Sequence, residues 1–185
     1  MTTSTVTRTL HDAGLAAWFG GSLMGAVGLN AAAGAVDDPR QAGRVANAGW
    51  NRWTPVNAGA IGALLVGSVG QLGGNADRVA GQKGVAGMAV VKTLLTGAAM
   101  GATAYSRLLG RKLSQAGDVP AESGTEPAAT TPPELASAQR QLKILQWVVP
   151  ASTGLLLAVS SYAGEQQRAS EVAKGAKGRL SLNRS

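Results

Sequence analysis

The sequence predicts an all-α fold: an integral membrane bundle of four transmembrane helices, with a short interfacial helix in the first loop. The main observation is how unevenly the charges are spread, because only 15% of the residues are charged and three long stretches carry none. These stretches are the 24 residues between Asp12 and Asp37, the 24 between Arg52 and Asp77, and the 21 between Lys143 and Glu165. A helix of 24 residues reaches about 36 Å and can cross a hydrocarbon core of about 30 Å.

A fourth apolar window runs from Gly84 to Ser106 and is interrupted only by Lys92. The four windows predict spans near residues 13–35, 54–75, 87–109 and 144–164, which together form a transmembrane domain over 13–164. Residues 1–12 are expected to be an N-terminal tail, 114–134 a flexible linker rich in Pro, Ala, Thr and Ser, and 165–185 a basic C-terminal helix and tail.

Two alternatives compete with this interpretation. A soluble Ala-rich bundle fits the mean hydropathy of only +0.07, but it needs polar residues at helical spacing, and residues 13–29 and 62–74 have too few. A cleaved signal peptide fits the small residues at 31–33, but the apolar run before them is longer than such a segment usually is.

Aromatic side chains lie near the predicted span ends, where amphipathic rings anchor at lipid headgroups. They are Trp18, Trp50, Trp53, Tyr105, Trp147 and Tyr162. The same positions also suit Trp side chains that pack on protein instead. We expect four of these rings, with nearby cations, to be interfacial or lipid-contacting residues. That set is Trp18, Arg40, Arg44, Trp50, Arg52, Trp53, Lys92 and Trp147.

The first loop predicts its own short helix. Asp37 or Asp38 can cap it, and Pro39 suits the first helical position. We expect Thr54 and Pro55 to start the second span in the same way. The loop arginines either bind lipid phosphates or an acidic partner, or are solvated juxtamembrane charges.

Small residues recur every fourth position in the spans, which lets helix backbones approach closely in lipid. The candidate helix-packing residues are Gly21, Gly25, Gly59, Ala63, Gly67, Gly97 and Gly101. They can serve contacts within the bundle or contacts with helices of another protein.

Lys92 is the one ionisable residue expected within a span. At the bilayer centre it costs about 2.5–3.5 kcal/mol, so it is either a functional group or a side chain that snorkels to the headgroups. The chain has no Cys and one His, which excludes thiolate metal sites and bis-His haem ligation. We expect no catalytic residues, no metal, no cofactor and no enzymatic activity. The net charge of +7 is spread over the span ends, so nucleic acid is not an expected partner.

The positive-inside rule leaves the orientation open, because eight Lys or Arg fall on each side of the predicted membrane. Counting only charges close to the spans favours cytoplasmic first and third loops, with both termini outside. The bias to Ala, Gly and Val, and to Arg over Lys, suggests a GC-rich bacterium, an actinobacterium among the candidates.

The segments AWFGGSL, PRQAGRV and WNRWTPVNAG, followed by SAQRQLKILQW before the last span, carry a resemblance. The chain resembles the four-span membrane protein family of unknown function that includes transmembrane protein 205. YSRLLGRK stands where that family usually has a Pro after the third span. The resemblance implies fold and topology and supplies no catalytic residues.

These observations predict a non-enzymatic accessory or scaffold subunit of a larger complex in a bacterial plasma membrane, with an envelope lipid-transport machine as one host. Its expected partners are membrane lipids and the transmembrane helices of other subunits. The alternative is a small stand-alone carrier or lipid-binding protein that uses Lys92 and the first-loop arginines.

Overall fold

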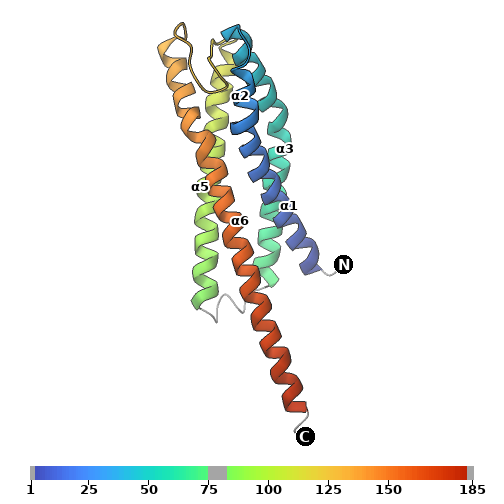
Figure 1. Cartoon of the computed structure of the whole chain (residues 1–185). Coiled ribbons are helices and arrows are strands. Elements are labelled where there is room, and N and C mark those ends of the chain that lie inside the picture. The colour runs from blue at the N-terminus through green and yellow to red at the C-terminus, as the bar shows by residue number, and fades with distance from the viewer. Residues whose placement is uncertain (1–2, 75–82, 183–185) are drawn as a thin grey trace.

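The computed structural model describes residues 3–74 and 83–182, and within these ranges it is helical with connecting loops and no strand (Figure 1). The elements are α1 (Thr3–Met24), the π-helix η1 (Gly25–Leu29), α2 (Asn30–Ala33), α3 (Pro39–Gly74), α5 (Lys83–Gln115) and α6 (Pro133–Leu182). Four helical segments are long and apolar enough to cross a membrane: Thr5–Ala33, Pro39–Gly73, Gly87–Gln115 and Pro133–Gly164. The prediction of an all-α chain with four helices of spanning length is therefore confirmed.

The helices form two close pairs joined along one side. α1 packs mainly on α3, α5 packs mainly on α6, and α1 also packs on α6, whereas α3 and α5 touch only sparsely. Figure 1 shows the α2–α3 turn and the α5–α6 loop at one end of the bundle, and α6 extending beyond the other helices at the opposite end. The 50 residues of α6 account for this extension, since they form a helix about 75 Å long.

One hydrophobic core joins all four long helices. It comprises Leu15, Trp18, Ala60, Leu64, Ala99, Val149 and Leu156. Trp18 is fully buried there, and its indole Nε1 donates a hydrogen bond to Thr103 Oγ1 at 3.2 Å. The expectation of an interfacial Trp18 is therefore corrected: a partner for the ring N–H inside the bundle lets this ring lie in the core.

Glycines bring α1 and α3 into backbone contact. A Cβ atom on Gly67 would overlap the backbone of His11 and Thr7, and one on Gly14 would overlap the backbone of Ala60 and Leu64. These positions therefore allow an approach that larger residues would prevent.

Two further glycines of the first span contact indole rings of α3, whereas Gly14 and Gly67 contact backbone. Gly21 lies under the ring of Trp53 and Gly25 under that of Trp50, so both tryptophans are half-buried against α1 and η1. Trp147 differs from them, because its side chain is 51% exposed on α6.

The expected short interfacial helix is not a separate element, because α3 runs without interruption from Pro39 to Gly74. Its start is as predicted: the N–H of Arg40 donates to Asp38 Oδ1 at 2.9 Å, and this hydrogen bond lowers the pKa of the Asp38 carboxyl below its ordinary value. The predicted second start does not form. The Thr54 hydroxyl donates to the Trp50 carbonyl at 2.8 Å instead of capping, and Pro55 lies inside the helix.

The loop between α5 and α6 contacts the bundle at several points, although its composition predicts a flexible linker with little to bury. Val119 packs with Leu109 and Leu113, and the N–H of Ala121 donates to the Pro39 carbonyl at 2.9 Å. Two ion pairs reach the loop from the helices: Arg44 with Asp118 at 3.3 Å, and Lys143 with Glu126 at 2.7 Å. Arg44, which was expected to contact lipid, therefore also forms an ion pair with the loop of its own chain.

The α1–α3 contact yields a first prediction. Gly67→Val should lower the stability of the purified protein by about 1–3 kcal/mol, because the added methyl groups overlap the α1 backbone. Gly97→Val is the matched control, since no heavy atom lies within 4 Å of a Cβ at that position. Thermal unfolding in detergent measures both, and equal melting temperatures for the two variants would contradict the close contact.

Candidate functional site

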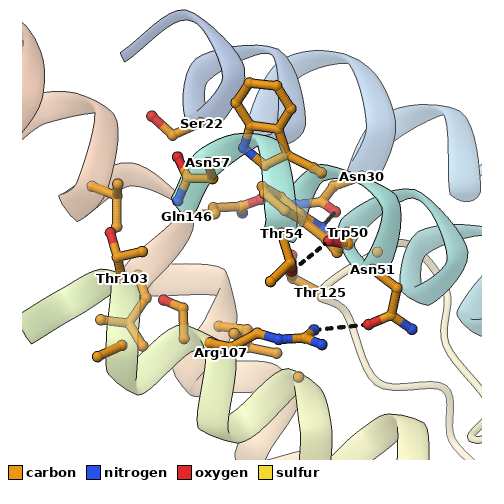
Figure 2. A pocket seen from close by; sticks show the side chains of 18 of the residues that line it. Ser22, Asn30, Trp50, Asn51, Thr54, Asn57, Thr103, Arg107, Thr125 and Gln146 are labelled. Atoms are coloured by element: carbon orange, nitrogen blue, oxygen red, sulfur yellow. Dashed lines mark hydrogen bonds between the residues drawn. The ribbon is translucent and has the colours of Figure 1, made fainter. Parts of the chain in front are cut away.

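A cavity of about 340 Å³ lies between α3 and α5, the two long helices that barely touch, and we call it the α3–α5 cavity. Figure 2 shows that α1, α3, α5 and α6 surround it and that side chains from these elements point into it. Its lining is mostly apolar but includes eleven side chains with polar groups other than indoles. These are Ser22, Asn30, Asn47, Asn51, Thr54, Asn57, Thr103, Ser106, Arg107, Thr125 and Gln146.

Asn30 is the central polar residue of the cavity wall. Its side chain is 3% exposed and satisfied on both sides: Nδ2 donates to Gln146 Oε1 at 2.8 Å, and Oδ1 accepts from Trp50 Nε1 at 2.9 Å. Its backbone carbonyl accepts the N–H of Gly124 at 3.0 Å. One asparagine thereby connects the first span, α3, α6 and the loop.

Main-chain hydrogen bonding departs from the α-helical pattern next to the cavity in three elements, which are η1, α3 and α6. The N–H of Asn30 bonds to the Gly25 carbonyl, which closes the π turn and sets the direction of the Asn30 side chain. Pro55 and Pro150 have no N–H, so they leave the carbonyls of Asn51 and Gln146 without their α-helical partners. Asn30, Asn51 and Gln146 all line the cavity.

Arg107 is the one charged residue in the cavity lining. Its Nη1 donates to Asn51 Oδ1 at 2.8 Å, and its Nε is buried without a hydrogen-bond partner. Across the cavity, Asn57 Oδ1 is likewise buried without a donor. The site therefore offers an unused donor on a cation and an unused acceptor, both of which a bound molecule can satisfy.

The residues predicted for a carrier site are not brought together. Lys92 lies half-buried on α5 outside the cavity lining, 15 residues and thus about 22 Å along the helix from Arg107. The three first-loop arginines lie exposed in the first half of α3, toward the opposite end of the bundle. They are Arg40, Arg44 and Arg52.

The predicted packing residues separate into two groups. Gly21, Gly25 and Gly67 contact other helices within the bundle, and Ala63 lies against the position of a Cβ on Gly14. The remaining three have no heavy atom within 4 Å of an added Cβ: Gly59, Gly97 and Gly101.

Charges and small residues, the two patterns followed in the sequence, do not predict most of the cavity lining. Four of the six asparagines in the chain line the cavity, and three of them fall between Asn47 and Asn57 around the second predicted span. Uncharged amides close to a span, together with Pro55 and Pro150 inside helices, were the available signals.

The described residues contain no group of three or more His, Cys, Asp or Glu side chains placed to hold a metal ion. No protein-family model, curated protein or solved structure matches the chain. What the cavity binds must therefore be argued from its own chemistry.

The Asn30 network yields a second prediction. Asn30→Ala should destabilise the protein by about 1–3 kcal/mol, because it leaves Trp50 Nε1 and Gln146 Oε1 without their partners. Asn47→Ala is the matched control, since the described residues supply no side-chain hydrogen bond to Asn47 although it lines the same cavity. Thermal unfolding compares them, and an Asn30→Ala protein as stable as Asn47→Ala would contradict the structural role of the network.

Proposed function

We propose that the chain is a multi-pass membrane protein that holds an amphiphilic molecule in the α3–α5 cavity. The cavity itself carries this proposal. Its volume of about 340 Å³ falls in the range of small-molecule sites, and it combines an apolar wall with a few polar side chains, as such sites do. A bacterial plasma membrane is the proposed location.

The distribution of side chains over the surface supports a lipid environment. Large apolar residues are more than half exposed on α3, α5 and α6, for example Val69 at 70%, Leu94 at 67% and Ile144 at 67%. Among the buried residues are His11, Asn30 and Thr153. So much exposed apolar surface is unfavourable in water but favourable in hydrocarbon. In a bundle surrounded by lipid, polar side chains are expected to lie between the helices, away from the hydrocarbon.

The position of the cavity supports an amphiphile that enters from the side. α3 and α5 contact each other only sparsely, so few contacts have to break for a molecule to pass between them from the bilayer into the cavity. A lipid or lipid-like molecule carries the combination of polar and apolar surface that the lining offers.

An accessory subunit of a membrane complex is a second candidate function, and one observation favours it. Gly97 and Gly101 of α5 lie four residues apart with open space before them, and the nearby Leu94 and Leu108 are largely exposed. A transmembrane helix of another subunit can approach such a face closely. The two candidate functions are compatible with each other in an envelope lipid-transport complex, where a subunit can both bind a lipid and contact other subunits.

The amphiphile proposal yields a third prediction. Ala104→Trp should fill the cavity and remove most of the lipid that copurifies with the protein, because Ala104 lines the cavity on α5. Ala98→Trp is the control, since Ala98 is an exposed α5 residue outside the cavity lining. Native mass spectrometry of protein extracted from carbonate-washed membranes counts the retained lipids.

Retention of the same lipids by both variants would contradict binding in the cavity. Recovery of the wild-type chain in the soluble fraction, without detergent, would contradict the membrane assignment.

The subunit candidate yields a fourth prediction. In mild detergent the wild-type chain should migrate in native gels as part of a larger assembly, and Gly97→Leu with Gly101→Leu should release it as a monomer. Gly21→Leu is unsuitable as a control because it overlaps Trp53, so Gly87→Leu, which also faces open space, serves instead. A wild-type chain that is monomeric in every mild detergent tested would contradict the subunit candidate.

A further inference from the structure

The α3–α5 cavity places a cation and a large apolar wall next to each other. α3 and α5 run in opposite directions, so Asn51 lies level with Arg107, with which it shares a hydrogen bond. Further from the loop between α5 and α6, the lining includes Ile61 on α3 and Met100 on α5, together with Trp18. A molecule that carries both a charged group and hydrocarbon matches this lining.

Arg107 brings an uncompensated positive charge to the cavity lining. Arginine stays protonated in proteins, and among the described residues no carboxylate forms an ion pair with Arg107. Its hydrogen-bond partner in the cavity, Asn51, is neutral, and its Nε has no partner. The guanidinium is half-buried, but its Nε is shielded from solvent and has no acceptor, so the cavity gains most from a ligand that supplies an anionic acceptor there.

We propose that Arg107 forms the headgroup site for an anionic membrane lipid, whose acyl chains lie toward Ile61 and Met100. Arg107 Nε donates to the anionic oxygen of the headgroup. This inference rests on the proposed function and adds the charge and orientation of the bound molecule.

A lipid fits the cavity better than a free anion because a free anion leaves the apolar wall unfilled. The exposed apolar residues Leu94 on α5 and Leu65 on α3 lie about 20 Å along their helices from Arg107 and Asn51, which is where acyl chains need hydrocarbon around them. Inorganic phosphate can satisfy Arg107 but gains nothing from Ile61 or Met100.

The test measures binding of phosphatidylglycerol and of phosphatidylcholine with identical chains to the full-length protein, by native mass spectrometry in detergent. The wild type should prefer phosphatidylglycerol by about tenfold, since a charge-assisted hydrogen bond contributes about that much. Arg107→Gln should abolish the preference, and Arg107→Lys should retain part of it. The matched control is Arg111→Gln, one helical turn further on, exposed and outside the cavity lining.

A second variant covers the case in which Arg107→Gln fails to fold. Asn57→Asp keeps the size of the side chain but adds a negative charge to the wall of the same cavity, so it should also reduce the preference for phosphatidylglycerol. Excess inorganic phosphate and glycerol phosphate should leave lipid binding to the wild type nearly unchanged.

The outcomes separate the two proposals. Equal binding of both lipids by the wild type, with both lost in Ala104→Trp, overturns the anionic headgroup and leaves the cavity function intact. Binding of neither lipid overturns the proposed function itself. Loss of the preference in Arg111→Gln to the same extent as in Arg107→Gln overturns the assignment to Arg107, and displacement of the lipid by inorganic phosphate overturns the commitment to a lipid.

Discussion

The close approach of α1 and α3 organises the whole bundle. Gly14 and Gly67 let the two backbones meet, and Gly21 and Gly25 accept the indoles that α3 presents to the first span. Because α1 is held so tightly to α3 and also packs on α6, the bundle is closed on that side and α3 is not drawn toward α5. The cavity is the space left by this unequal packing.

The polar residues of the cavity fall into two kinds that serve different purposes. Asn30 uses its side chain fully and fastens the first span to α3, α6 and the loop, so its contribution is structural. Arg107 and Asn57 each keep an atom without a partner. Leaving such atoms unpaired lowers stability, and proteins tend to accept that cost where a ligand completes the bonding.

Charge patterning predicted the helices well but the cavity poorly, for a physical reason. A membrane core excludes charged side chains, so long uncharged stretches predicted the helices of spanning length. An amide costs less to bury than a charge, so asparagines occur within uncharged stretches without interrupting them. The charge pattern therefore did not reveal Asn30, Asn51 and Asn57. Pro55 was predicted to start a helix because Thr54, a residue type that caps helices, precedes it. The Thr54 hydroxyl bonds back to Trp50 inside a continuous helix, a choice that depends on the contacts of α3 with the first span.

The position of Trp18 could not be read from local sequence either, because its partner, Thr103, is 85 residues away. A tryptophan near a span end is favourable at a headgroup and equally favourable in a core that supplies an acceptor for its N–H. Only the tertiary packing of α1 on α3 and α6, which brings Trp18 within hydrogen-bond distance of Thr103, distinguishes the two. The same holds for the loop between α5 and α6, where Val119 packs with Leu109 and Leu113.

The π turn at Gly25–Leu29 has a consequence for the length of the first span. A π turn holds one residue more than the α-helical turn it replaces, and each residue of an α-helix turns the chain by about 100°. Removing one residue from this segment converts the π turn into an α turn and leaves every later side chain in nearly its present direction, whereas removing one from α1 turns them by about 100°. Only in the second case does Asn30 point away from both Trp50 and Gln146. The first span therefore tolerates the loss of a residue within the π turn better than the loss of one in α1.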